Sequence, residues 1–256
     1  MKLHKAFAVL LCATALAACD KNAVQDITGP LPAAQIKFFN FAVGAPAVNF
    51  YANDQKITAI RSTTGTEDVA GVVYGGVGAG DYYTGIQPGQ YTLSGRISAA
   101  TDKDLPISGL QATIADGKKY SFYQSGRYNT AEKKTDAFIV EDNFPAAIDY
   151  TQAYVRFVHA IHNGQPMTLY AKNRESEVVY PIGGEVAYKA GGAFTPIPVG
   201  AYDLYTRAAG SDKDVIVRAN VTFAVKRVHT IAARGDMTVT TTAANGLPFL
   251  DNTTNR

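Results

Sequence analysis

Cysteine and tryptophan are almost missing from this chain of 256 residues. It has two cysteines, Cys12 and Cys19, and no tryptophan. Because both cysteines lie near the N-terminus, no disulfide can join the parts of the chain that follow them. A cysteine nucleophile and a cysteine-ligated metal site are excluded there as well. The folded part must be stabilised by its hydrophobic core, for which 46% apolar residues suffice.

An excess of charge of either sign is missing too. The chain has 24 Lys and Arg against 22 Asp and Glu, and Lys2 and Lys5 account for the difference. The remainder is formally neutral, which argues against nucleic-acid binding, because such binding depends on neutralising many phosphates with Lys and Arg. The apolar stretch 6–16 is far shorter than the about 20 residues that a membrane-spanning helix needs.

The N-terminal residues have the layout of a secretory signal over residues 1–18. Lys2 and Lys5 precede the apolar stretch, and small residues lead into Cys19. A small-residue run that ends in cysteine resembles the lipobox of bacterial lipoproteins. In that family the cysteine thiol receives a diacylglycerol, and cleavage makes the cysteine the new N-terminus. The resemblance implies a lipid such as palmitate on Cys19. An ordinary secretory cleavage site at 15–17 is the alternative.

A lipid on Cys19 would place the protein in the cell envelope. One acyl chain binds a membrane only marginally, whereas two or three hold firmly. We expect anchoring to the periplasmic side of the inner or outer membrane, or to the cell surface. Asp20 follows the cysteine, and in enteric lipoproteins an aspartate at this position favours the inner membrane. The choice of membrane stays open.

The residues that are abundant favour β-structure. Tyr and Phe number 15 and 12, and aromatic and β-branched side chains suit pleated, half-buried surfaces. Alternation is clear in single segments: Ile36 and Phe38 share one face, and Val155 and Phe157 repeat the pattern. The sequence predicts an all-β protein of two tandem immunoglobulin-like antiparallel β-sandwich domains.

Two stretches of the chain resemble each other. Residues 34–41 match 153–160 at an offset of 119, with aliphatic, basic and aromatic residues at the third, fourth and fifth positions. Residues 88–93 match 199–204 at an offset of 111, so the first copy holds about eight extra residues. They fall in the glycine-rich run 71–80. That run lacks the ending of a nucleotide-binding loop, and we predict a flexible surface loop.

These matches predict a domain organisation. It consists of a signal peptide at 1–18, a tether at 19–32, a first β-sandwich at 33–144, a second at 150–245 and a flexible tail at 246–256. The segment 141–146 would join the two copies.

The repeated unit resembles domain-of-unknown-function family 4397. That family opens with a strand of the form Val-Arg-Phe-Val-His-Ala, which residues 155–160 match, and Tyr170 and Gly200-Ala201-Tyr202 follow at suitable spacing. The first copy departs, with Phe39-Asn40-Phe41 in place of Val-His-Ala. The resemblance implies an exported or envelope protein of bacteria. It implies no catalytic residue, because the family has no established activity.

Histidines and paired aspartates are the candidates for a metal or catalytic site. We expect His159 to bond a nearby loop from a strand end, with a catalytic base or a metal pair with His162 as the alternatives. The segments 102–104 and 212–214 both read Asp-Lys-Asp. We expect solvated hairpin tips there, with calcium binding as the alternative. The sequence predicts no metal, no cofactor and no catalytic residue.

Tyrosines are the candidates for a binding surface. Tyr82 and Tyr83 adjoin Asp81, and Tyr123 is predicted to point outward from a strand that buries residues 120 and 122. Tyr128 is predicted to lie in the loop that follows. Exposed amphipathic rings can stack on sugars or anchor a protein partner, although more often they cover neighbouring strands.

These observations predict a non-enzymatic envelope lipoprotein. Its partners would be the membrane, through Cys19, and an envelope glycan or protein, with a plain structural role also open. A glycan-acting enzyme that uses loop carboxylates such as Asp81 or Asp149 is the alternative. It would require two carboxylates about 5–10 Å apart.

Overall fold

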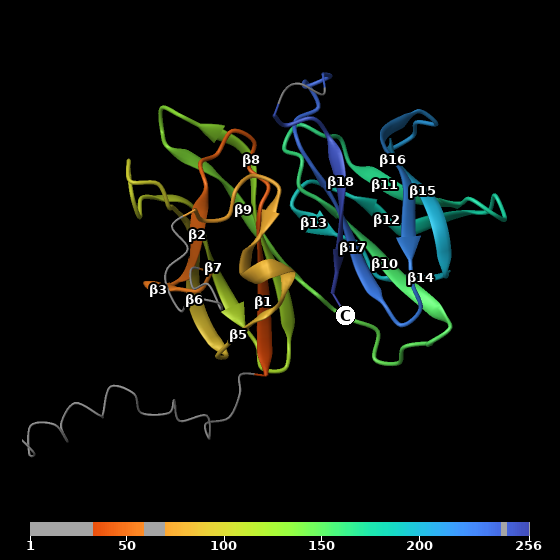
Figure 1. The fold of residues 1–256 in the computed structure, drawn as a ribbon, viewed down its shortest axis with the longest axis horizontal. Helices are drawn as coiled ribbons and strands as arrows, with labels where there is room; N and C mark the ends of the chain where they lie inside the picture. The colour runs from red at the N-terminus through yellow and green to blue at the C-terminus, as the bar shows by residue number, and fades with distance from the viewer. Residues whose placement is uncertain (1–32, 59–69, 242–244, 256) are drawn as a thin grey trace, which may run out of the picture. The chain divides into compact units, whose positions relative to one another are not determined.

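The computed structural model describes residues 33–58, 70–241 and 245–255, and they form a protein built of β-strands (Figure 1). The first half contains β1 (Ala34–Asn40), β2 (Val48–Ala52), β3 (Gln55–Lys56), β4 (Gly76–Val77), β5 (Thr84–Ile86), β6 (Gly89–Ile97), β7 (Pro106–Ile114), β8 (Lys119–Asn129) and β9 (Lys134–Glu141), with a 3-10 turn, η2 (Gly78–Asp81), after β4. None of the helical segments in the described part of the chain has the length and apolarity of a membrane span.

The second half contains β10 (Gln152–His159), β11 (Met167–Asn173), β12 (Val179–Val186), β13 (Ala190–Gly191), β14 (Thr195–Pro198), β15 (Gly200–Ala208), β16 (Asp214–Phe223), β17 (Val228–Arg234) and β18 (Phe249–Thr254). Signal peptide, tether and lipidated Cys19 are predictions that lie outside the described residues.

Each half has two sheets with corresponding strand orders. In the first half the orders are β4-β1-β8-β9, with β5 also on β1, and β3-β2-β6-β7. In the second half they are β13-β10-β17-β18, with β14 also on β10, and β12-β11-β15-β16. The predicted all-β sandwich class is confirmed.

The sandwiches depart from the prediction in one respect, because each contains a parallel pair. β1 runs parallel to β8, and β10 runs parallel to β17. Between β1 and β8 the chain passes to the other sheet for β2 and β3, returns to the edge of the first sheet for β4 and β5, and crosses again for β6 and β7. Such a crossover permits neighbouring strands to run in the same direction.

A separate core fills each half. Ile36 and Phe38 project from β1 into a cluster with Phe50, Leu93 and Phe122. The second core corresponds to it, with Val155, Phe157, Leu169, Leu204 and Ile231 among its members. The alternation seen in the sequence therefore identified the face of each strand that points into its own sandwich.

The opposite faces of β1 and β10 are also buried, because a third cluster joins the two halves. Large rings come from the first half, namely Phe39, Phe41, Tyr123 and Phe138. Small side chains come from the second, namely Val158, Ala160 and Ala232. The prediction that Tyr123 points to solvent is wrong: it is fully buried and stacks on Phe39 with ring centroids 4.5 Å apart.

The predicted flexible tail at 246–256 is also wrong for the residues described. β18 pairs along its length with β17, and Leu250 is fully buried in the second core. The segment has few apolar residues because polar side chains occupy both faces: Asp251 bonds Arg234, and Asn252, on the same face as Leu250, bonds His229. The second sandwich extends past residue 245 and includes β18.

Candidate functional site

Two buried cations lie at corresponding positions in the two halves. Lys37 is the fourth residue of β1, and Arg156 holds the matching place in β10, 119 residues further along. Each has a hydroxyl-bearing residue beside it on the neighbouring strand: Lys37 pairs in register with Ser121, and Arg156 with Thr230. The two cations are only 2% and 1% exposed. A buried charge is costly unless it is paired, so the partners of these cations are decisive.

Arg156 has a buried carboxylate as its partner. Its guanidinium forms an ion pair with Asp142, which follows β9 in the first half, and it donates to the carbonyl of Glu141 at 3.1 Å. Nε donates to Oγ1 of Thr230 at 2.9 Å. The second oxygen of Asp142 accepts from Ser121 at 2.8 Å and from the hydroxyl of Tyr83 at 2.5 Å. This network links the halves, and its charges compensate each other.

Among the described residues, no buried carboxylate contacts Lys37 directly. Nζ donates to the carbonyl of Thr254 at 2.9 Å, and it lies 4.7 Å from the centre of the Tyr83 ring. Its ion pair is with Asp81, at 3.6 Å, whose side chain is half-exposed. Burial lowers the pKa of Lys37, an effect that the charges of Asp81 and Asp142 oppose.

Asn255 occupies in the second half the position that Asp142 has in the first. The amide of Asp142 donates to the carbonyl of Lys119 at 2.7 Å, and the amide of Asn255 donates to that of Val228 at 2.7 Å. Asp142 accepts from Ser121, whereas Asn255 donates through Nδ2 to Thr230 at 2.6 Å. The position that would supply Lys37 with a carboxylate therefore holds a neutral amide.

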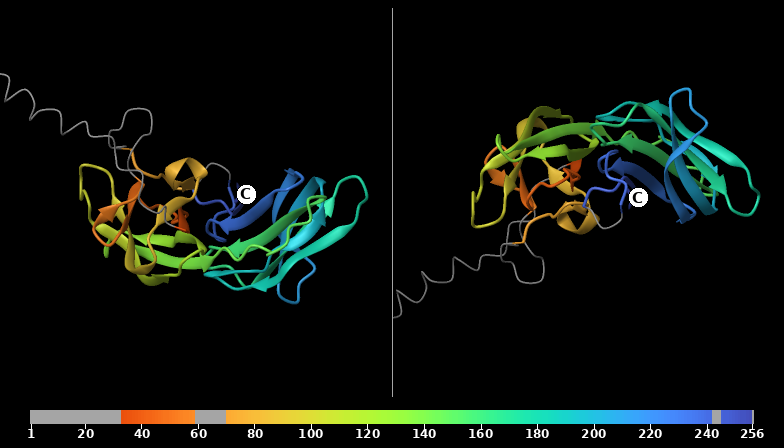
Figure 2. Two further views of the ribbon diagram at one scale, coloured as in Figure 1. Left: turned by 90° about the horizontal axis from the view of Figure 1, so that it is seen from below. Right: turned by 90° about the horizontal axis from the view of Figure 1, so that it is seen from above.

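A cleft of about 510 Å³ opens beside Lys37. The first half contributes Lys37, Asp81, Tyr82 and Tyr83 to its wall, and the second half contributes Arg227, His229, Thr254 and Asn255. Both views in Figure 2 show the C-terminal residues close to the turn η2. We define the cleft by these residues.

Two buried polar atoms in the wall of the cleft have no hydrogen-bond partner in the described structure. They are Nε2 of His229 and Oδ1 of Asn255. The other ring nitrogen of His229 lies 3.0 Å from Oδ1 of Asn252. Burial, and secondarily the charge of Arg227, lowers the pKa of His229, so the ring is neutral near pH 7. Leaving a buried polar atom unpaired costs about 1–3 kcal/mol, a cost that a bound ligand would relieve.

The turn η2 brings Asp81 and Tyr82 to the mouth of the cleft. Ala79 and Asp81 adopt the left-handed conformation, with φ of 54° and 72°, as does Gly80 between them. This conformation is unfavourable for residues with a Cβ. It directs Asp81 toward Lys37 and leaves the side chain of Tyr82 77% exposed. The glycine-rich run predicted to be only a surface loop thus includes β4, paired with β1, and the turn that shapes the cleft.

The four predicted surface tyrosines have different environments. Tyr82 and Tyr83 both line the cleft, Tyr82 exposed and Tyr83 half-buried. Burial, with the nearby charge of Asp142, raises the pKa of the Tyr83 hydroxyl. Tyr123 lies instead in the cluster between the halves. Tyr128 was predicted in a loop, which is wrong, because β8 continues to residue 129 and the ring packs against the first core.

The remaining candidates lie apart from the cleft. His159 ends β10, and its Nε2 lies 3.0 Å from the carbonyl of Gln165, which is the loop contact expected for it. Residues 102–104 lie in the turn between β6 and β7, and residues 212–214 lead from the turn after β15 into β16, which begins at Asp214. No cluster of three or more potential metal ligands occurs in the described ranges.

Asp149 does not line the cleft. Its oxygens accept from Thr151 and Gln152 at 2.7–2.9 Å, and these bonds lower the pKa of the carboxyl. Asp81 is the one carboxylate among the described residues of the wall. Burial raises the pKa of Asp81, against the attraction of Lys37.

Sequence reasoning missed Lys37, Asp142, Arg156, His229 and Asn255 as parts of a site. A signal was present for two of them, because Lys37 and Arg156 recur at the same offset inside apolar strands. Asp142 and Asn255 carried no such signal, since they follow their last strands in segments that read as linker and tail.

Fold and site together define a β-sandwich protein with a polar cleft between two halves. Residues 34–170, more than half of the chain, match the family described as "Domain of unknown function (DUF4397)". The chain belongs to this family. The match begins at β1 and ends in β11, so it covers the strands of the first half and, in the second half, β10 and part of β11.

Two solved structures show weak similarity. The Bacillus anthracis TIE protein is similar over 78% of this chain and 32% of its own length, at 12% identity and a TM-score of 0.23. The chain thus spans about a third of that protein. A candidate cell adhesion protein from Bacteroides ovatus is similar over 89% of this chain and 97% of its own, at 10% identity and a TM-score of 0.21. No curated protein matches the sequence.

Proposed function

We propose that this protein is a lipid-anchored envelope protein that binds a glycan, without catalysis, in the cleft between two copies of one β-sandwich module. The cleft carries the proposal. It combines the exposed ring of Tyr82 with the unpaired atoms of His229 and Asn255. An exposed aromatic ring can stack on a pyranose, and sugar hydroxyls both donate and accept hydrogen bonds.

Duplication of the module is supported by the corresponding strand orders and by the matched pairs Lys37 with Arg156 and Asp142 with Asn255. The ligand would then bind at a position where the two copies differ, namely at Asn255, which corresponds to Asp142. A glycan-hydrolysing role ranks second, because hydrolysis commonly uses two carboxylates flanking the bond, whereas Asp81 stands alone in the described wall.

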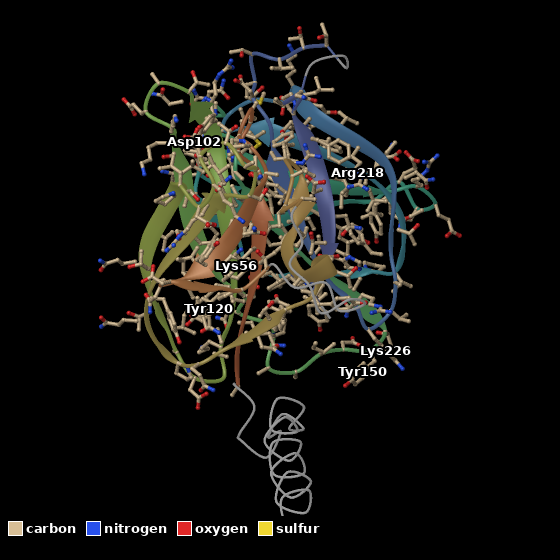
Figure 3. The ribbon with its side chains drawn as sticks, turned by 60° about the vertical axis from the view of Figure 1, so that its left-hand side comes forward. Lys56, Asp102, Tyr120, Tyr150, Arg218 and Lys226 are labelled. Atoms are coloured by element: carbon tan, nitrogen blue, oxygen red, sulfur yellow. The ribbon has the colours of Figure 1, made fainter. Side chains whose placement is uncertain are left out.

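Glycan binding is tested with the full chain, purified in detergent, on an array of bacterial envelope oligosaccharides. Tyr82→Ala is compared with Tyr150→Ala, since Tyr150 is 58% exposed and does not line the cleft. Tyr150 lies beside Lys226 (Figure 3). We expect Tyr82→Ala to weaken binding at least tenfold, the equivalent of about 1.4 kcal/mol, and Tyr150→Ala to leave it unchanged. An array without any bound glycan contradicts the proposal.

The anchor is tested by mass spectrometry of the N-terminal peptide from the membrane fraction. We expect a diacylated Cys19 as the first residue. Cys19→Ser should release the protein from membranes, whereas Cys12→Ser, inside the predicted signal, should not. An unmodified terminus at Ala18 or Cys19 in soluble extract contradicts the anchor.

A further inference from the structure

The two buried cations differ in how they are neutralised, and this difference lies at the cleft. Arg156 contacts the buried carboxylate of Asp142. The position that corresponds to Asp142 holds Asn255, whose Oδ1 is buried and has no hydrogen-bond partner among the described residues. The carboxylate that does reach Lys37 comes from Asp81, at 3.6 Å and half-exposed. The counter-ion of Lys37 therefore stands at the rim of an open cleft.

The charges of the wall favour an anionic group. Lys37 and Arg227 are its cations, and Asp81 is the one carboxylate among the described lining residues. His229 is neutral near pH 7. A ligand carboxylate that took the place of Asp81 would leave Lys37 paired and would free Asp81 to turn into solvent.

We propose that the cleft binds a sugar that bears a carboxylate, with the carboxylate on Lys37 in place of Asp81 and with Arg227 as a second cation. The ring would stack on Tyr82, and ring hydroxyls would pair with Oδ1 of Asn255 and Nε2 of His229. This inference rests on the proposed glycan binding and adds the chemical class of the ligand. Hexuronates and nonulosonates, the sialic-acid type, share this chemistry.

The test is calorimetric titration of the full chain in detergent with two pairs of probes. One pair is trigalacturonate and its carboxyl-reduced counterpart, and the other is sialyllactose and its carboxyl-reduced counterpart. We expect the acid of one pair to bind at least tenfold more tightly than its reduced form, because a charge-assisted hydrogen bond is lost on reduction. The pair that shows this preference identifies the source of the carboxylate.

Variants of charged residues separate the roles of the charges. Arg227→Gln should weaken the acid about fivefold to tenfold, because a charge contact is lost, and should leave the reduced form unchanged. Lys226→Gln, next to it and outside the described wall, is the matched control. Asp81→Asn should strengthen acid binding, because it removes the competing carboxylate. Lys37→Met should abolish the preference for the acid, and a thermal scan checks that this variant is folded.

The outcomes distinguish this inference from the proposed function. Equal binding of acid and reduced forms, still dependent on Tyr82, overturns the acidic class and keeps glycan binding. Weaker acid binding by Asp81→Asn overturns the exchange at Lys37. If none of the four probes binds while neutral glycans bind on the array, the acidic class is again overturned. If neither the titration nor the array detects binding, both proposals are overturned.

Discussion

Asn40 and His159 hold corresponding positions at the ends of β1 and β10 and make the same contact. Oδ1 of Asn40 accepts from the amide of Ala42 at 3.4 Å, and Nδ1 of His159 accepts from the amide of Ile161 at 3.2 Å. Both side chains are fully buried. Two different residue types thus satisfy the same backbone group, two residues after the strand end.

His159→Asn should therefore be tolerated, whereas His159→Ala should not. The asparagine can accept from Ile161 as Asn40 does from Ala42, so we expect a loss within about 1 kcal/mol. The alanine leaves a buried amide unpaired and should cost about 1–3 kcal/mol. Urea unfolding near neutral pH measures both. Equal losses for the two variants would show that the bond to Ile161 is not what His159 contributes.

The pH dependence of stability follows from the two buried histidines. Burial lowers the pKa of His159 and of His229 below the ordinary value of 6.5. The unfolded chain then binds more protons than the folded chain just below that pH, so stability rises with pH there. We expect the full contribution above about pH 6.5 and a progressive loss as the pH falls toward the folded pKa values.

Measurement of the free energy of unfolding between about pH 8 and pH 5 checks this. The double variant His159→Asn, His229→Gln should have a flatter profile than the wild type over that window. A wild-type profile that is already flat below pH 6.5 would contradict the lowered pKa values.

Asp142→Asn should destabilise the protein strongly. The change reproduces at this position the amide that Asn255 supplies in the second half, but here it leaves the guanidinium of Arg156 buried without a counter-charge. Removing one partner of a buried pair costs about 3–5 kcal/mol. Denaturant unfolding measures the loss, and Asp212→Asn at an exposed hairpin tip is the control, expected within about 0.5 kcal/mol. Equal losses of stability for the two variants would mean that the ion pair between Asp142 and Arg156 does not stabilise the protein.

Removal of the chain after residue 245 should prevent the second sandwich from forming properly. The deletion takes away β18, the buried Leu250, and the carbonyl of Thr254 that accepts from Lys37. We expect exposed apolar surface, visible as binding of a hydrophobic dye, and rapid proteolysis of the second half. A truncated chain that melts at the wild-type temperature would contradict the role assigned to β18.

The sequence was sufficient for the class of fold and for the faces of the strands that point into each sandwich. Ile36 with Phe38 and Val155 with Phe157 identified those faces because alternation with a period of two is a local property. Alternation does not reveal whether the other face meets water or a second layer. Tyr123 was therefore predicted to point outward, although it is buried in a cluster with Val158 and Ala232.

The cleft was beyond sequence reasoning for a related reason. Its atoms come from segments far apart in the chain: Lys37 contacts Thr254, 217 residues away. Tyr82 and Tyr83 were found because exposed rings next to a turn are visible locally. Asn255 and His229 were not, since what sets them apart is the lack of a partner, and that is a property of the folded arrangement.

The cluster between the halves is asymmetric. The first half contributes rings such as Phe39 and Phe41, and the second contributes small residues such as Ala160 and Ala232. Two ring-bearing sides brought together would collide, and two small-residue sides would leave a void. The ring-bearing surface of the first sandwich is thus complementary to the small-residue surface of the second, and neither surface is complementary to itself. A second copy of the first sandwich, inserted in place of the small-residue side, would therefore not pack against the rings of the first sandwich.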